Sequence, residues 1–146
     1  MLMISMTNED LHDRAVLAIA KERFRYPDKD NPDWKTWTNT KEKRSMGVKT
    51  NGDFVYPDIV VTDSENKVIM AGEIETESTI SEEGVKQWKQ FQELCGACFV
   101  YVPESYEEQS RELFEKGNFS VSGLRTYLFD GRNIIISVTC NKKVLR

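Results

Sequence analysis

The sequence contains few prolines and glycines, which interrupt regular structure, and few cysteines, which form disulfide bonds. Its 146 residues include four prolines, eight glycines and three cysteines. It has no long Gly, Ser or Pro stretch, no low-complexity tract and no internal repeat, so nothing indicates a linker or a repeat array. A hydrophobic content of 39% suffices for one sizeable core, and we expect a single domain over residues 1–146. Three cysteines cannot all pair, which favours thiols and a reducing compartment.

A long hydrophobic run is also missing. The apolar segment 1–6 is too short for a signal peptide, and no later segment approaches the length of a membrane span. We therefore expect a soluble, cytoplasmic protein that does not bind membranes.

The chain lacks a surplus of positive charge as well. Its net charge of −4 argues against a protein that holds nucleic acid through bulk electrostatics. Positive charge is local, because residues 35–49 and residues 125–146 each contain five bases and one acid. Residues 63–83 contain seven acids and one base. Acidic side chains are thus concentrated in the middle of the chain, between two basic segments.

The spacing of apolar residues and turn signals predicts an α/β protein. Thr7 and Asp10 resemble a capping box before the first helix, and Gly96 and Gly117 close the later helices. Residues 97–102 are apolar at both parities, as in a central strand that is covered on both faces. The order is αβββαβ followed by αββ. The predicted elements are a helix over 11–24, a loop to residue 40, strands over 44–49, 54–62 and 67–76, a helix over 78–95, a strand over 97–102, a helix over 105–116, and a hairpin of 124–129 with 134–138.

Most of the candidate catalytic and metal-binding residues lie on the third predicted strand. Glu73, Glu75 and Glu77 alternate there, so that neighbours share one face about 6.6 Å apart. Carboxylates this close repel one another unless a cation neutralises them, which leaves a metal site or an exposed rim. Ile69 and Ala71 precede them at the same parity and favour a buried site. Asp58 lies on the preceding strand, where antiparallel pairing would bring it beside Glu73. Such oxygen ligands suit Mg²⁺ or Mn²⁺.

Two segments carry a resemblance to a known family. They resemble the signature of the PD-(D/E)XK nuclease superfamily, whose restriction-endonuclease-like core has the order αβββαβ. The segments are Tyr56-Pro57-Asp58-Ile59-Val60-Val61 and Ala71-Gly72-Glu73-Ile74-Glu75-Thr76. The resemblance covers roughly residues 7–102. It implies a nuclease that depends on a divalent metal and hydrolyses phosphodiester bonds, with DNA as the expected substrate, and family members often work as homodimers.

The same resemblance implies roles for individual residues. Asp58 and Glu73 would bind the metal, the backbone carbonyl of Ile74 would be a further ligand, and position 75 would orient the attacking water. The family usually has Lys at this last position, and some of its restriction enzymes carry Glu or Gln and remain active. Here the residue is Glu75, which would accept a proton or hold a second metal.

Two other hypotheses follow from the missing lysine. Lys86 or Lys89 of the following helix would swing toward the acids and supply the positive charge. Alternatively, the fold no longer cleaves and serves as an inactive module that binds nucleic acid or a protein partner.

Several further residues have both a functional and an ordinary interpretation. Trp37, with Trp34, would stack on unpaired bases or pin its loop to the core. Lys43, Arg44 and Lys49 would contact phosphates or protect an edge strand from aggregation. For two others we favour the ordinary role: His12 as a surface or hydrogen-bonded histidine, and the pair Cys95 and Cys98 as packing residues, because a helix C-terminus opposes a thiolate.

Overall fold

The structure is a computed structural model that describes residues 6–50, 52–94, 97–117 and 123–137. These residues form a mixed β-sheet with helices on both faces. Within these residues the large sheet has the strand order β1-β4-β5-β6-β7-β8, and β2 and β3 form a separate pair. The α/β class is confirmed. The strands are β1 (Lys35–Thr38), β2 (Val48–Lys49), β3 (Phe54–Val55), β4 (Ile59–Thr62), β5 (Val68–Ile74), β6 (Ala97–Pro103), β7 (Gly123–Phe129) and β8 (Ile134–Ile136). The helices are α1 (Asn8–Arg23), α2 (Glu82–Leu94), the 3-10 helix η1 (Glu104–Tyr106) and α3 (Glu107–Lys116).

The sheet combines both strand directions. Strands β1, β4 and β5 are antiparallel neighbours, β5, β6 and β7 run parallel, and β8 returns antiparallel to β7. A parallel pair requires a crossover, which α2 supplies between β5 and β6 and α3 supplies between β6 and β7. Antiparallel β4 and β5 are joined by a tight turn in which Asn66 has a φ of 62°.

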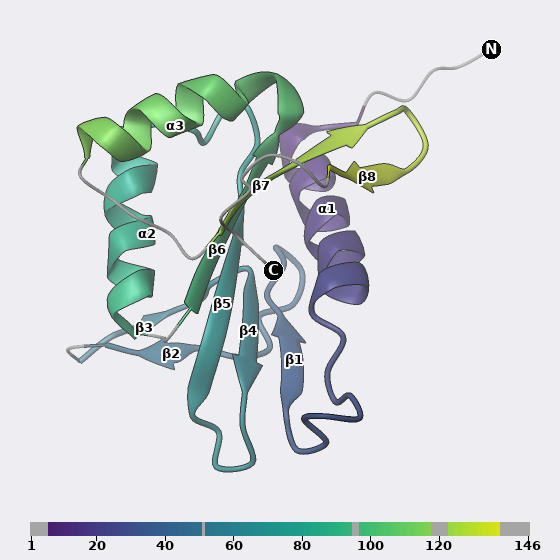
Figure 1. Ribbon diagram of the computed structural model, residues 1–146, viewed down its shortest axis with the longest axis vertical. Coiled ribbons are helices and arrows are strands. Elements are labelled where there is room, and N and C mark those ends of the chain that lie inside the picture. The colour runs from purple at the N-terminus through teal and green to yellow at the C-terminus, as the bar shows by residue number, and fades with distance from the viewer. Residues whose placement is uncertain (1–5, 51, 95–96, 118–122, 138–146) are drawn as a thin grey trace.

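Helices cover the two faces of the sheet, with α1 on one side and α2 on the other (Figure 1). Phe99 and Tyr101 of β6 lie in the core cluster that α1 covers. Val100 and Val102, at the alternate positions, lie in the cluster formed with Trp88 of α2 and with α3. The prediction of a strand buried on both faces is therefore confirmed for β6.

The first helix forms where its capping residues predict it. The Thr7 hydroxyl accepts a hydrogen bond from the Asp10 N–H at 3.0 Å, which satisfies one of the backbone donors exposed at a helix start. Val16 and Ile19 are fully buried against the sheet. His12 precedes Val16 by one turn and therefore lies on the same face of α1. This position directs it toward one end of the sheet.

The first strand of the sheet is not where the sequence predicts it. Residues 35–38, expected in a loop, form β1 and pair with β4 along its whole length. The predicted strand 44–49 yields only an isolated bridge from Arg44 to Asn39 and the short β2. Strand pairing thus overrides local composition. The expected strand 54–62 is interrupted at Pro57, which has no N–H for a ladder, and divides into β3 and β4.

Other boundaries also differ from the prediction. Strand β5 ends at Ile74, so Glu75 and Glu77 lie beyond it, and Glu77 is exposed, where it accepts a hydrogen bond from the Tyr106 hydroxyl at 3.3 Å. Residues 104–106 form η1, so α3 begins at Glu107. Cys98 is buried in β6, whereas Cys95, Gly96, Val138 and Cys140 lie outside the described residues. Among the described helices, none has the length and apolar composition needed to cross a membrane.

Candidate functional site

Asp58 and Glu73 lie together at one end of the sheet. Ile59 of β4 pairs with Gly72 of β5, so Asp58, one residue earlier, is opposite Glu73 in the same antiparallel register. The Asp58 Oδ2 atom accepts a hydrogen bond from the Ile74 N–H at 2.8 Å, which joins the two strands beyond their last paired residues. Both acidic residues are largely buried. The arrangement expected from the sequence for these two carboxylates is present.

Glu73 is a buried carboxyl group that forms no ion pair within the part of the chain that the structure describes. Burial raises its pKa well above the ordinary value of 4.5, and the neighbouring carboxylates of Asp58 and Glu75 raise it further. Its Oε1 atom is buried and accepts no hydrogen bond from any described residue. A buried polar atom without a partner is costly. A cation or a donor group bound at this atom would therefore stabilise the protein.

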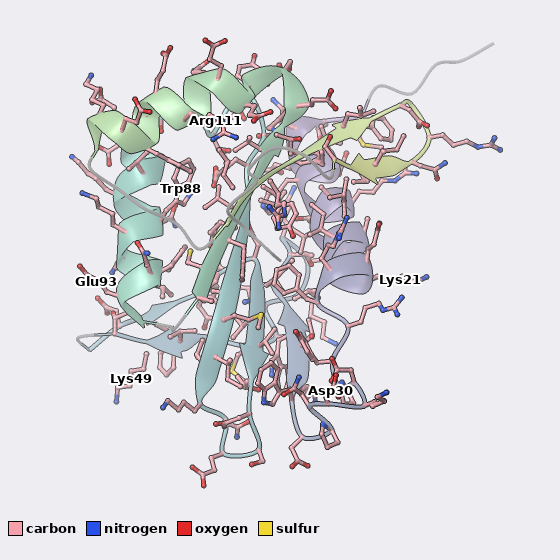
Figure 2. The ribbon with its side chains drawn as sticks, in the orientation of Figure 1. Lys21, Asp30, Lys49, Trp88, Glu93 and Arg111 are labelled. Carbon is pink, nitrogen blue, oxygen red and sulfur yellow. The ribbon has the colours of Figure 1, made fainter. Side chains whose placement is uncertain are left out.

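Glu75 is fixed by α2, although it lies beyond the end of β5. The indole N–H of Trp88 donates to Glu75 Oε1 at 3.0 Å, and Figure 2 shows Trp88 projecting from α2 toward the sheet. Its backbone is held on both sides, because the Glu75 N–H donates to the Tyr101 carbonyl at 2.8 Å and the Tyr127 hydroxyl donates to the Glu75 carbonyl at 2.6 Å. Burial raises the pKa of Glu75 to about 7, although hydrogen bonds from Thr79 and Trp88 oppose the increase.

His12 contacts the site from α1. Its Nε2 atom lies 3.0 Å from Asp58 Oδ1, and its Nδ1 atom lies 3.0 Å from Asp13 Oδ1. Burial alone would lower the pKa of the imidazole, but the two carboxylates raise it to about 9. The ring is therefore positively charged at neutral pH and bridges Asp13 and Asp58. His12 is hydrogen-bonded, as we expect from the sequence, but the sequence does not predict its contact with Asp58.

The acids line a polar cleft of about 640 Å³ between the sheet and α2, here called the acidic cleft. A second hollow of about 400 Å³, the adjacent cleft, lies toward α1. The two share His12, Tyr56, Asp58 and Thr79, so Asp58 lies where they meet. The acidic cleft is also lined by Glu73, Ile74, Glu75, Ser81, Glu83, Gly84, Lys86, Gln87 and Gln90.

Lys86 lies at the edge of this cleft. Its side chain is 75% exposed, and its ammonium is 3.7 Å from the carboxylate of Glu83, one turn earlier in α2. It therefore lines the cleft without pairing with Asp58, Glu73 or Glu75 in this conformation. The side chain of Ile74 lies in the core on the α1 face, so only its backbone can contribute to a site.

The predicted nucleic-acid contacts occupy two different places. Arg44 lines the adjacent cleft, and its guanidinium lies 4.9 Å from the centre of the Tyr56 ring. Lys43 and Lys49 are exposed. Trp37 lies on β1, where its indole N–H donates to the Thr62 hydroxyl at 2.9 Å and the Lys35 ammonium covers its ring at 3.9 Å. Trp34 packs against Tyr26 at the edge of the core, as the pinning interpretation expects.

The donor set is compatible with a hard divalent cation. Among the described residues, no group of three or more His, Cys, Asp or Glu side chains is arranged to hold a metal ion. Mg²⁺ commonly uses only one or two carboxylates and keeps several waters. The paired carboxylates of Asp58 and Glu73, together with the unpartnered Glu73 Oε1, fit that requirement.

Comparison of the chain with models of known protein families, with curated proteins and with solved structures finds no match. The interpretation of the site therefore depends on its own residues.

Proposed function

We propose that this protein is a divalent-metal-dependent nuclease with a restriction-endonuclease-like core of the PD-(D/E)XK type. The elements α1, β1, β4, β5, α2 and β6 follow the order αβββαβ, with the β2–β3 pair inserted between β1 and β4. Asp58, directly before β4, and Glu73, near the end of β5, are the residues that the resemblance assigns as metal ligands. The observation that carries the proposal is the buried, unpartnered Glu73 Oε1 beside Asp58 in an open polar cleft.

Six residues of the acidic cleft have a role in this proposal. Asp58 and Glu73 would hold Mg²⁺ or Mn²⁺, with the Ile74 carbonyl as a further ligand, and the ion would act as a Lewis acid toward the scissile phosphate. Glu75, held in place by Trp88, would orient the attacking water. Lys86 at the cleft edge would approach the phosphate from α2. His12 fixes Asp58 from α1.

Metal-dependent cleavage tests the proposal directly. The purified protein should cut DNA or RNA when Mg²⁺ or Mn²⁺ is present and not in EDTA. Glu73→Gln and Asp58→Asn should each abolish the activity, because each removes a charged ligand while keeping the shape of the side chain. Glu93→Gln is the matched control, since Glu93 is an exposed acid on α2 that lines neither cleft (Figure 2). Cleavage that persists in both site variants would refute the assignment.

A second candidate is a module that binds nucleic acid or a protein partner without cleaving. The observation in its favour is that Asp58 already has partners, His12 and the Ile74 N–H, while Lys86 is paired with Glu83. Calorimetry separates the two candidates. Binding of a divalent ion that Glu73→Gln abolishes supports the nuclease, whereas ligand binding with no uptake of Mg²⁺ or Mn²⁺ favours the module.

A further inference from the structure

The β2–β3 pair presents one face to solvent beside the adjacent cleft. Val48 pairs with Val55 and Lys49 pairs with Phe54. Successive residues of a strand point to opposite faces, so Val48 lies on one face, where it is buried, and Phe54 and Lys49 lie on the other. Figure 2 shows Lys49 pointing outward from β2. In the same register Gly47 is opposite Tyr56 and shares the outer face with Phe54.

The outer face carries two exposed aromatic rings. Phe54 is 61% exposed and Tyr56 is 38% exposed. A Cβ atom at Gly47 would lie only 3.0 Å from Phe54 Cδ1 and 3.0 Å from Tyr56 Cε1, so both rings lie directly against Gly47, and a side chain at this position would displace them.

Two positively charged side chains lie beside these aromatic rings. Arg44 lies over the Tyr56 ring, and Lys49 is opposite Phe54. Residues 41–56 contain four bases and only two acids, Glu42 and Asp53, in a chain whose net charge is −4. Tyr56 lines both clefts and so connects this face to Asp58. A ligand with flat rings and a negatively charged backbone would match both the aromatic rings and the basic side chains. A chain-like ligand of this kind could extend from this face to Asp58 and Glu73.

We propose that the outer face of the β2–β3 pair binds single-stranded nucleic acid, with bases stacked on Phe54 and Tyr56 and phosphates beside Arg44 and Lys49. Stacking requires bases that are not enclosed in a duplex, and it tolerates any sequence because every base has a flat face. The inference rests on the proposed function and names its substrate class: unpaired strands or single-stranded ends, which the hairpin delivers to Asp58 and Glu73.

Binding without cleavage tests this inference. Fluorescence anisotropy in EDTA would measure the affinity of the 146-residue chain for a labelled oligothymidylate, an oligouridylate and a DNA duplex of the same length. Phe54→Ala should weaken binding of the single strands by roughly 5- to 150-fold, the effect of losing one stacked base. Phe54→Trp should restore it. Gly47→Ala keeps both rings but displaces them from their present positions, and it should weaken binding as well.

Leu17→Ala is the matched control, because Leu17 is a 54% exposed apolar side chain on α1, outside both clefts. It should leave the affinity unchanged. Equal or tighter binding of the duplex, or equal binding by Phe54→Ala, overturns the inference even if metal-dependent cleavage is observed. Full competition by an acidic peptide would assign the face to a protein partner instead. Conversely, stacking-dependent binding without cleavage supports the inference and refutes only the nuclease.

Discussion

Replacing Glu75 by glutamine should change how the stability of the protein depends on pH. Burial raises the pKa of Glu75 from 4.5 to about 7 in the folded protein. Below about pH 4.5 the group is protonated in both the folded and the unfolded state and has no effect. Between about pH 4.5 and 7 the unfolded chain loses this proton while the folded protein keeps it, so the free energy of unfolding falls as the pH rises. Above about pH 7 the loss is complete.

The magnitude follows from the two pKa values. Each pKa unit corresponds to about 1.4 kcal/mol, so the raised pKa of Glu75 should cost the wild type about 3 kcal/mol between pH 4.5 and 8. Glutamine does not titrate, and its amide oxygen can still accept the hydrogen bond from Trp88. Glu75→Gln should therefore gain about 3 kcal/mol relative to the wild type as the pH rises across this range.

Urea denaturation in EDTA at several pH values would measure this difference. EDTA is needed because a bound divalent ion would stabilise the ionised carboxylates and mask the effect. Glu77→Gln serves as the control, because Glu77 is two residues away and exposed. It should follow the pH dependence of the wild type. If the curves of Glu75→Gln and the wild type are parallel from pH 4.5 to 8, burial does not control this carboxyl group and the reasoning is wrong.

Two further predictions concern the charges around the cleft. His12 is the only histidine of the chain, so its ring signals in an NMR titration are unambiguous. The pKa of the His12 ring should be about 9 in the wild type. It should fall by more than one unit in Asp58→Asn, because this variant leaves the ring buried without the Asp58 carboxylate. Because the pKa of His12 is raised in the folded protein, the contact between His12 and Asp58 stabilises the fold fully below about pH 6.5, and this stabilisation disappears as the pH rises through 9. An unchanged His12 pKa in Asp58→Asn would exclude the contact. Glu75→Lys, which restores the usual residue of the resembled family, should destabilise the protein by roughly 1–3 kcal/mol in denaturation experiments, since it leaves the buried indole N–H of Trp88 without its acceptor. Wild-type stability in Glu75→Lys would contradict the close contact with Trp88.

The sequence predicts the central part of the fold because its signals there are local and strong. The capping residue Thr7 and the double-sided apolar pattern of β6 each determine their element without help from distant residues. The edge strand β1 has no such pattern. Its four residues include Lys35 and two threonines, and they form a strand because β4 offers an unpaired edge. Long-range pairing of this kind is not encoded in the spacing of neighbouring residues.

The same distinction applies to the site. Asp58 and Glu73 are predictable because one hairpin joins them, so antiparallel pairing and residue numbering determine their proximity. His12 is separated from Asp58 by most of the first helix, a loop and three strands, and their contact depends on where α1 packs. One signal was present in the sequence: His12 lies one helical turn before the buried residue Val16 and on the same face. Extending the apolar face of the helix by one turn would have included it.

The glutamate at position 75 has a structural counterpart on α2. Trp88 is a fully buried side chain whose indole N–H is a donor only. It donates to Glu75 Oε1, so an acceptor at position 75 satisfies it. A lysine there would place an ammonium, which is also only a donor, against the indole N–H. Trp88 and Glu75 are therefore a matched pair. In this chain His12 supplies a positive charge next to the acids, and it does so from α1, the helix on the other face of the sheet from α2.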